Sequence, residues 1–124
     1  MTYSGEGIRH YLSCFSQAMI WFEPVFAHNL LIEDFRFMYF NQAALQYIGL
    51  SEHELKGVRV SKASFMDDWL ELKLLEELKE VYLTNKASEG VLFNTVLKKQ
   101  AHVRWRKMFD GVIARIADVS TLNH

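Results

Sequence analysis

The stretch Asp34–Phe40 limits how this chain can fold, because it is apolar on both faces of a strand. In an extended strand, successive side chains point to opposite faces of the sheet. The two faces would carry Phe35, Phe37 and Tyr39 on one side and Met38 and Phe40 on the other. A strand with two apolar faces needs a cover on each side. We therefore predict a sheet packed between two layers.

A helical stripe near the N-terminus can supply one of these covers. Within 7–17, four apolar residues have the spacing of one helix face: Ile8, Tyr11, Leu12 and Phe15. This helix could cover the sheet of its own chain or that of a second copy. We expect a homodimer in which these four residues and the outer sheet face form the interface.

Size and charge restrict the chain to one domain without an obvious electrostatic partner. Half of the 124 residues are hydrophobic, and only seven are Gly or Pro, which excludes disorder and linker character. The net charge of -1 offers no field for nucleic acid or a membrane surface. No apolar run approaches the ~20 residues of a membrane span. With no signal-type segment at the N-terminus, we expect a cytoplasmic protein.

The remaining elements follow from capping and turn residues. Asn41 and Gly49 bound a short helix over 42–48, and Ser51 with Glu54 forms a capping box before Gly57. A long helix should run from Asp68 to about Lys86. Strands are expected at 18–27, 34–40, 90–97, 103–109 and 112–119, with Pro24 at a strand end or bulge.

The dipeptide Asp110-Gly111 predicts a two-residue hairpin loop, because a type I′ turn needs positive φ at both central residues. The resulting register places Arg106 opposite Arg115, with Arg104 diagonal to Arg115, and Trp105 opposite Ile116. Like charges opposite each other destabilise a sheet unless something compensates. We favour a solvated face with Glu6, Glu23 or another carboxylate as partner. The alternative is an anion site formed by Arg104, Arg106 and Arg115.

Three segments resemble the PAS domain family in the right order and spacing. The first is 34–44, an apolar strand that ends in Asn41 and leads into a helix of small residues. The second is 45–57, a glycine-terminated helix followed by a serine-capped turn that ends in Gly57. The third is Ile116–Ser120, which is similar to the Asp-hydrophobic-Ser/Thr ending of PAS domains. The similarity covers about 18–121.

The resemblance implies an α+β fold with a five-stranded antiparallel sheet in the order 2-1-5-4-3 and helices on one face. It divides the chain into an N-terminal helical extension (1–17), a PAS-like domain (18–121) and the start of a linker to an effector in cis (122–124). Such domains act in signal transduction as non-catalytic sensors or docking modules of histidine kinases, two-component systems and other regulators. Asp118 and Ser120 would pass the signal onward.

The resemblance also permits tests of known cofactors. Haem-type PAS domains take an axial histidine from the long helix, and 69–86 contains none. Flavin-type light sensors use a cysteine on the helix after the second strand, whereas Cys14 lies upstream of it. Both comparisons argue against these cofactors. We expect Cys14 to be a buried or half-buried small apolar residue. The five scattered histidines lack metal-ligand spacing, so no metal is expected.

Between the sheet and the long helix we favour a filled core, with a ligand pocket as the alternative. The residues expected to line or fill it are Trp69, Phe93, Trp105, Ile116 and Tyr39, and the three tryptophans, Trp21 included, should be mostly buried. Two alternatives stay open. One is a small α+β enzyme of the ketosteroid isomerase type with a buried acid, for which Asp118 opposite Val103 is the candidate. The other is a docking module without a ligand.

Overall fold

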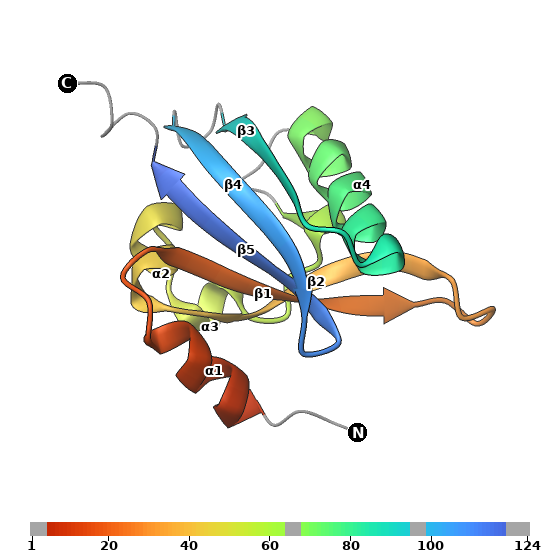
Figure 1. Cartoon of the computed structure of the whole chain (residues 1–124), viewed down its shortest axis with the longest axis horizontal. Coiled ribbons are helices and arrows are strands. Elements are labelled where there is room, and N and C mark those ends of the chain that lie inside the picture. The colour runs from red at the N-terminus through yellow and green to blue at the C-terminus, as the bar shows by residue number, and fades with distance from the viewer. Residues whose placement is uncertain (1–4, 64–67, 95–98, 119–124) are drawn as a thin grey trace.

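The computed structural model describes residues 5–63, 68–94 and 99–118 (Figure 1). Its elements, in chain order, are α1 (Gly5–Ser13), β1 (Ala18–Phe26), β2 (Ile32–Phe40), α2 (Gln42–Ile48), α3 (Glu52–Leu55), the 3-10 turn η1 (Val60–Lys62), α4 (Asp68–Thr84), β3 (Ser88–Asn94), β4 (Lys99–Met108) and β5 (Gly111–Asp118). The strands form one antiparallel sheet in the order β2-β1-β5-β4-β3, which confirms the predicted fold class and strand order. None of the helices in the described part of the chain has the length and hydrophobicity of a membrane-spanning segment.

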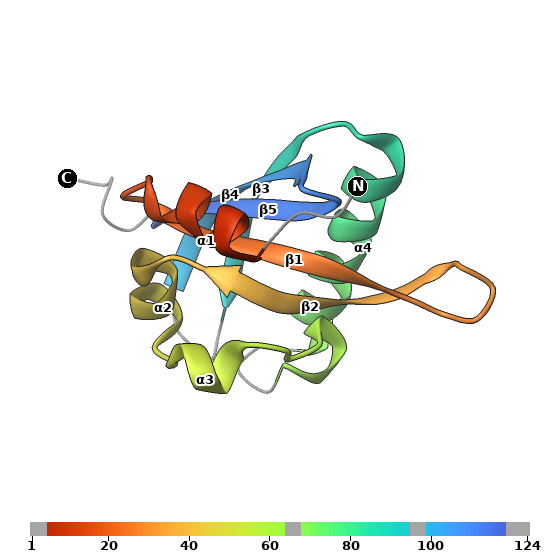
Figure 2. The same cartoon turned by 90° about the horizontal axis from the view of Figure 1, so that it is seen from below.

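The sheet lies between two hydrophobic cores, as the two apolar faces of 34–40 predict. On the inner face, α2, α3, η1 and α4 cover a core that contains Phe22, Phe37 and Trp105. On the outer face, α1 covers a smaller core built from Ile8, Leu12, Met19, Trp21 and Ile113. Figure 2 shows α1 on one side of the β1–β2 ladder and α2 and α3 on the other. The outer cover therefore comes from the chain itself.

A β-bulge in β2 changes which residues share a face. Trp21 pairs with Tyr39, but the next residue, Phe22, pairs with Phe37, so Met38 has no partner in the ladder. The extra residue interrupts the alternation of side chains. Tyr39 consequently packs in the outer core, while Phe40 joins Phe37 in the inner core. The predicted placement of Tyr39 beside Phe37 was wrong for this reason.

The β4–β5 hairpin turns one residue earlier than the sequence predicts. The two turn residues are Phe109 and Asp110, with φ of 55° and 58°, and Gly111 is the first residue of β5. The register moves by two residues, so Arg104 lies opposite Arg115, Arg106 opposite Ile113, and Trp105 opposite Ala114. The predicted pair of Arg106 with Arg115 was therefore wrong. A shift of two residues leaves every side chain on its predicted face.

Local caps match the sequence. Asn41 accepts a hydrogen bond from the Ala44 amide at the start of α2, and Gly49 ends that helix with a φ of 84°. Ser51 and Glu54 form the expected capping box on α3. The long helix α4 ends at Thr84, earlier than predicted, because Asn85 adopts a left-handed conformation with φ of 56°.

Two further expectations were wrong in detail. Pro24 lies within the paired part of β1 and faces Phe35, and it is neither at a strand end nor at one of the two register shifts of the β1–β2 ladder. Since β5 pairs only with the first half of β1, Ala18–Phe22, a missing backbone donor beyond that point is tolerated. Cys14 is exposed, although a buried or half-buried position was expected. Its place just after the last turn of α1 holds it outside the outer core.

Candidate functional site

The inner face holds a buried tryptophan with an unused hydrogen-bond donor. Trp105 is only 1% exposed and packs in the inner core beneath α4. Its indole Nε1 has no hydrogen-bond partner among the described residues. A buried N–H without an acceptor costs about 1–3 kcal/mol. Trp21, by contrast, donates its Nε1 hydrogen to the Met108 carbonyl at 2.8 Å.

The expected pocket residues do not all lie together. Ile116 packs against the inner core that contains Trp105, as predicted. Tyr39 lies on the opposite face, where it stacks on Trp21 with ring centroids 5.7 Å apart. The side chains of Trp69 and Phe93 lie outside the described residues. So do the side chain of Asp118 and the whole of Ser120. Of the three tryptophans, Trp21 and Trp105 are confirmed as buried.

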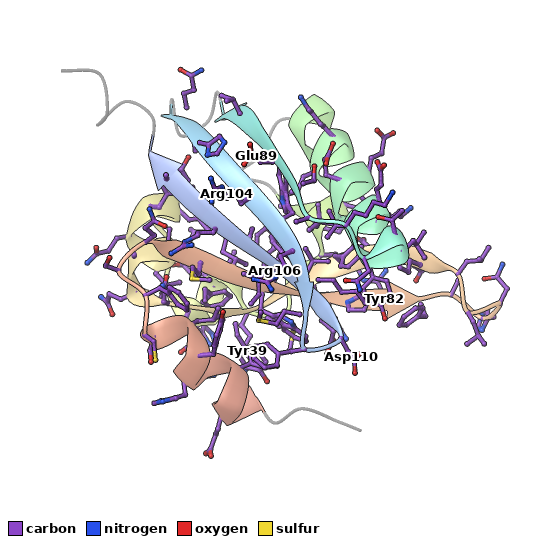
Figure 3. The ribbon with its side chains drawn as sticks, in the orientation of Figure 1. Tyr39, Tyr82, Glu89, Arg104, Arg106 and Asp110 are labelled. Carbon is purple, nitrogen blue, oxygen red and sulfur yellow. The ribbon has the colours of Figure 1, made fainter. Side chains whose placement is uncertain are left out.

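The three arginines predicted as an anion site share the outer face of β4 and β5. Arg104 lies directly opposite Arg115, and Arg106 is the next outward residue along β4. Glu89 of β3 lies opposite Arg104 and accepts a hydrogen bond from its Nε at 3.1 Å. Figure 3 shows Glu89, Arg104 and Arg106 following one another over β3 and β4.

Glu89 is a carboxylate that the sequence alone did not identify as the partner. Of the two expected partners, Glu23 instead forms an ion pair with Arg36. Within the described residues, no ion pair joins Glu6 to an arginine. The register between β3 and β4 places Glu89 beside Arg104, and that register was not predicted because no short turn signal links the two strands.

A groove of about 590 Å³ runs over these arginines on the outer face. Tyr11 and Phe15 line one side, and Ala87–Glu89 line the other; Met19, Met108 and Ile113 contribute apolar surface. Arg104 and Arg115 also line an adjoining hollow with Gln17 and His102. The two arginines therefore lie between two depressions.

The helix α1 has little apolar surface left for a partner. Ile8 and Leu12, at 2% and 0% exposure, are buried in the outer core of their own chain. Tyr11 and Phe15 are only partly buried and border the groove. A second copy could contact these two residues without displacing α1, but it could not contact Ile8 or Leu12.

Asn41 joins α1 to the sheet. Its Oδ1 accepts hydrogen bonds from the amides of Met19 and Ala44, both at 3.0 Å. Its Nδ2 donates to the carbonyls of Leu12, Phe15 and Gln17 at 3.1, 3.3 and 2.8 Å. One buried side chain thus caps α2 and also bonds the Leu12 carbonyl of α1 and two carbonyls of the segment that follows α1. The helix α1 ends at Ser13 and not at Gln17 as the apolar stripe suggested.

The buried acid in the described structure is Asp34, not Asp118. Asp34 is 2% exposed and accepts hydrogen bonds from the Phe35 amide and from the amide and hydroxyl of Ser61. These bonds attach η1 to β2, which is a structural role. Asp118 pairs with Ala101 and not with Val103 as the predicted register required. In the described part of the chain, no three His, Cys, Asp or Glu side chains are grouped as metal ligands would be.

Tyr82 of α4 lies where the helix meets the β4–β5 turn. Burial raises the pKa of Tyr82, and the negative charge of Asp110 raises it further. The ammonium of Lys107 lies 4.2 Å from the centre of the Tyr82 ring. Phe35 meets the same ring edge-on at 6.2 Å, which places Tyr82 at the rim of the inner core.

Comparisons with known proteins support the fold. No protein-family model matches the chain, and no curated protein matches it either. Among solved structures, the chain is similar to a domain of an HTR-like protein from Haloarcula marismortui ATCC 43049, with a TM-score of 0.60 at 14% identity. The match covers 82% of this chain and 97% of that domain. At this identity the likeness concerns the fold alone.

Proposed function

We propose that this chain is a non-catalytic sensory or regulatory domain of a signal-transduction protein, and that its inner core binds a small molecule. Support comes from the PAS-like residue pattern of 34–57 and from the strand order, which is the one that the pattern implied. A domain of an HTR-like protein has a similar fold. Because one fold serves many functions, the proposal depends on the site.

The observation that carries this proposal is the unpaired indole N–H of Trp105. Buried donors are nearly always satisfied, so an exception at 1% exposure needs an explanation. A ligand with a carbonyl, carboxylate or hydroxyl oxygen would supply the missing acceptor. Gly90 lies on the neighbouring strand, and a Cβ at this position would be 3.6 Å from the Trp105 ring.

Binding at Trp105 would act on β5, since Trp105 pairs with Ala114 in its middle. β5 also pairs with β1, whose first residues lie beside Asn41 and the end of α1. A ligand that favours one arrangement of this sheet would shift the population of that state. The conformational change would be transmitted to an effector in cis, either through α1 or through Asp118 and Ser120.

The test uses the indole N–H resonances of the three tryptophans in the ¹H–¹⁵N spectrum of the purified chain. Trp105→Phe assigns the Trp105 signal. After native mass spectrometry identifies any molecule retained on purification, that molecule is removed by partial unfolding and then added back. The expected result is a downfield shift of the Trp105 proton alone, as its hydrogen bond forms.

The Trp21 signal is the internal control, because its N–H is already bonded to Met108. The proposal is overturned if the purified protein carries no molecule and a mixture of small carboxylates, amides and alcohols leaves the Trp105 resonance unchanged. In that case, the docking module without a ligand becomes the better description.

A further inference from the structure

We propose that the groove on the outer face of the sheet binds an amphiphilic carboxylate, separately from any ligand of the inner core. The acid group would lie between Arg106 and Arg115, and the apolar part would lie over Met19, Met108 and Ile113. This inference does not rest on the proposed function, because it concerns the opposite face of the sheet.

The strand register brings the guanidinium groups to one place. Arg104 and Arg115 are direct cross-strand partners, and Arg106 is diagonal to Arg115. Diagonal neighbours on one face of a sheet are about 7–8 Å apart at the backbone, which long side chains span easily. The fourth corner of this square is Ile113, the partner of Arg106. An anion here would meet cations on three sides and an apolar residue on the fourth.

The local charges do not balance. Arg104 is held by Glu89 at 3.1 Å, and His102 lies 3.9 Å from the same carboxylate. Within the described structure, Arg106 and Arg115 form no ion pair with a carboxylate. The three arginines therefore carry two positive charges more than Glu89 offsets. Placing Arg104 opposite Arg115 is unfavourable without an additional anion.

One of the two unpaired arginines is already oriented. The guanidinium carbon of Arg115 lies 5.2 Å from the centre of the Phe15 ring, in a cation–π contact. This contact holds the side chain against the wall of the groove, so less freedom is lost when an anion binds. A guanidinium presents its donors in a planar fork that matches the two oxygens of a carboxylate.

The shape and lining of the groove favour a small molecule with an apolar body. Its volume of about 590 Å³ lies within the range of small-molecule sites, and it is bounded on two sides by α1 and by the start of β3. The apolar groups include two methionines, whose flexible thioethers adapt to varied shapes. Inorganic phosphate could use the arginines but would gain nothing from Met19, Met108 and Ile113.

The experiment uses 2-naphthoate as the probe, with 2-naphthamide, acetate and inorganic phosphate as comparisons. Binding to the full chain is followed by the methyl signals of methionines labelled with ¹³C. The expected result is that 2-naphthoate shifts the Met19 and Met108 signals, and that the other three compounds bind at least about tenfold more weakly. Arg106→Gln and Arg115→Gln should each weaken 2-naphthoate binding by about tenfold, the loss typical of one charge-assisted hydrogen bond.

Arg59→Gln is the matched control, because Arg59 is an exposed arginine that pairs with Glu33 away from the groove. It should bind 2-naphthoate as the unaltered chain does. Arg106 is exposed, and its change to Gln should leave the fold intact, which far-ultraviolet circular dichroism checks.

Four results would overturn the inference. The first is 2-naphthoate binding that neither arginine variant weakens. The second is phosphate or acetate binding as tightly as 2-naphthoate, which would mean that the arginines attract any anion. The third is self-association at every concentration tested by sedimentation, together with no binding of 2-naphthoate because a second copy occupies the groove. The fourth is a shift of the Trp105 indole resonance without a shift of the Met19 methyl signal, which would place the probe on the inner face.

Discussion

The side-chain amide of Asn41 lies 3.1 Å from the carbonyl oxygen of Leu12, although the two residues belong to opposite layers of the molecule. Leu12 is fully buried in the outer core, and Asn41 caps a helix that covers the inner core. This bond and its neighbours make the position of α1 depend on the end of β2. A movement of α1 should therefore shift the end of β2, and a movement of β2 should shift α1.

Replacing Asn41 tests this link. Asn41→Ala removes the cap of α2 and leaves buried backbone groups unpaired, so we expect a loss of about 2–4 kcal/mol in the free energy of unfolding. Asn41→Ser retains a capping oxygen, but its single hydroxyl hydrogen cannot replace the three bonds that Nδ2 donates, so this variant should lose less stability than Asn41→Ala. Urea denaturation measures both. An Asn41→Ser protein as stable as the original would show that the bonds to α1 contribute nothing. Asn29→Ala, at an exposed asparagine, is the control.

Gly111 should tolerate no side chain. A Cβ at this position would lie 2.4 Å from the Phe22 carbonyl oxygen and 2.6 Å from the Trp21 ring, and the backbone cannot move aside cheaply. Gly111→Ala should lower the free energy of unfolding by about 1–3 kcal/mol or more. Gly90→Ala is the matched control in another strand, because its Cβ would meet only the Trp105 ring at 3.6 Å. Equal melting temperatures for the two variants would contradict this account.

Glycine 111 also shows why the hairpin register was predicted incorrectly. The sequence rule assigns a glycine after aspartate to the turn, because such turns need positive φ. In the structure the turn residues are Phe109 and Asp110, and Gly111 is not among the residues with positive φ. The glycine is required by the close approach of β1. A contact between distant parts of the chain cannot be read from a dipeptide.

Features set by neighbouring residues, by contrast, were predictable. The caps at Asn41 and at Ser51 with Glu54 depend on side chains three residues away, and both are present as expected. The apolar stripe of α1 was also recognised, and it does cover the sheet. The unpaired donor of Trp105 and the pairing of Arg104 with Glu89 depend on tertiary packing, so neither could be predicted from the sequence.

Alkaline titration should reveal how the negative charge of Asp110 affects the pKa of Tyr82. The folded-state pKa of Tyr82 is raised, so the tyrosine contributes stability that is fully present below its unfolded pKa of about 10 and is lost as pH rises through the higher folded value. Asp110→Asn removes the negative charge and should lower the pKa of Tyr82 towards its ordinary value. Asparagine accepts the positive φ of this position, so the turn should persist.

The measurement for Tyr82 is the difference in tyrosinate absorbance between each protein and its Tyr82→Phe counterpart. An unchanged Tyr82 midpoint in Asp110→Asn would mean that burial alone raises the pKa.

Leu12 should be the residue on which docking of α1 depends most. It is 0% exposed, and Leu12→Ala should lower the free energy of unfolding by about 2–5 kcal/mol through lost contacts and a cavity. Cys14→Ala, at an exposed position just beyond α1, should change the free energy of unfolding by no more than about 0.5 kcal/mol. Hydrogen exchange would show whether α1 opens before the sheet. Similar losses for both variants would mean that α1 is not docked as described.

The unpaired Met38 gives β2 an unusual tolerance to shortening. Removing one residue from a strand normally turns every following side chain to the wrong face. Here, deletion of Met38 would leave Phe37, Tyr39 and Phe40 in simple alternation, with each still opposite its present partner on β1. The length of this strand is thus one residue greater than its pairing requires. Relatives of this chain could differ in length at this point without exchanging the residues of the two cores.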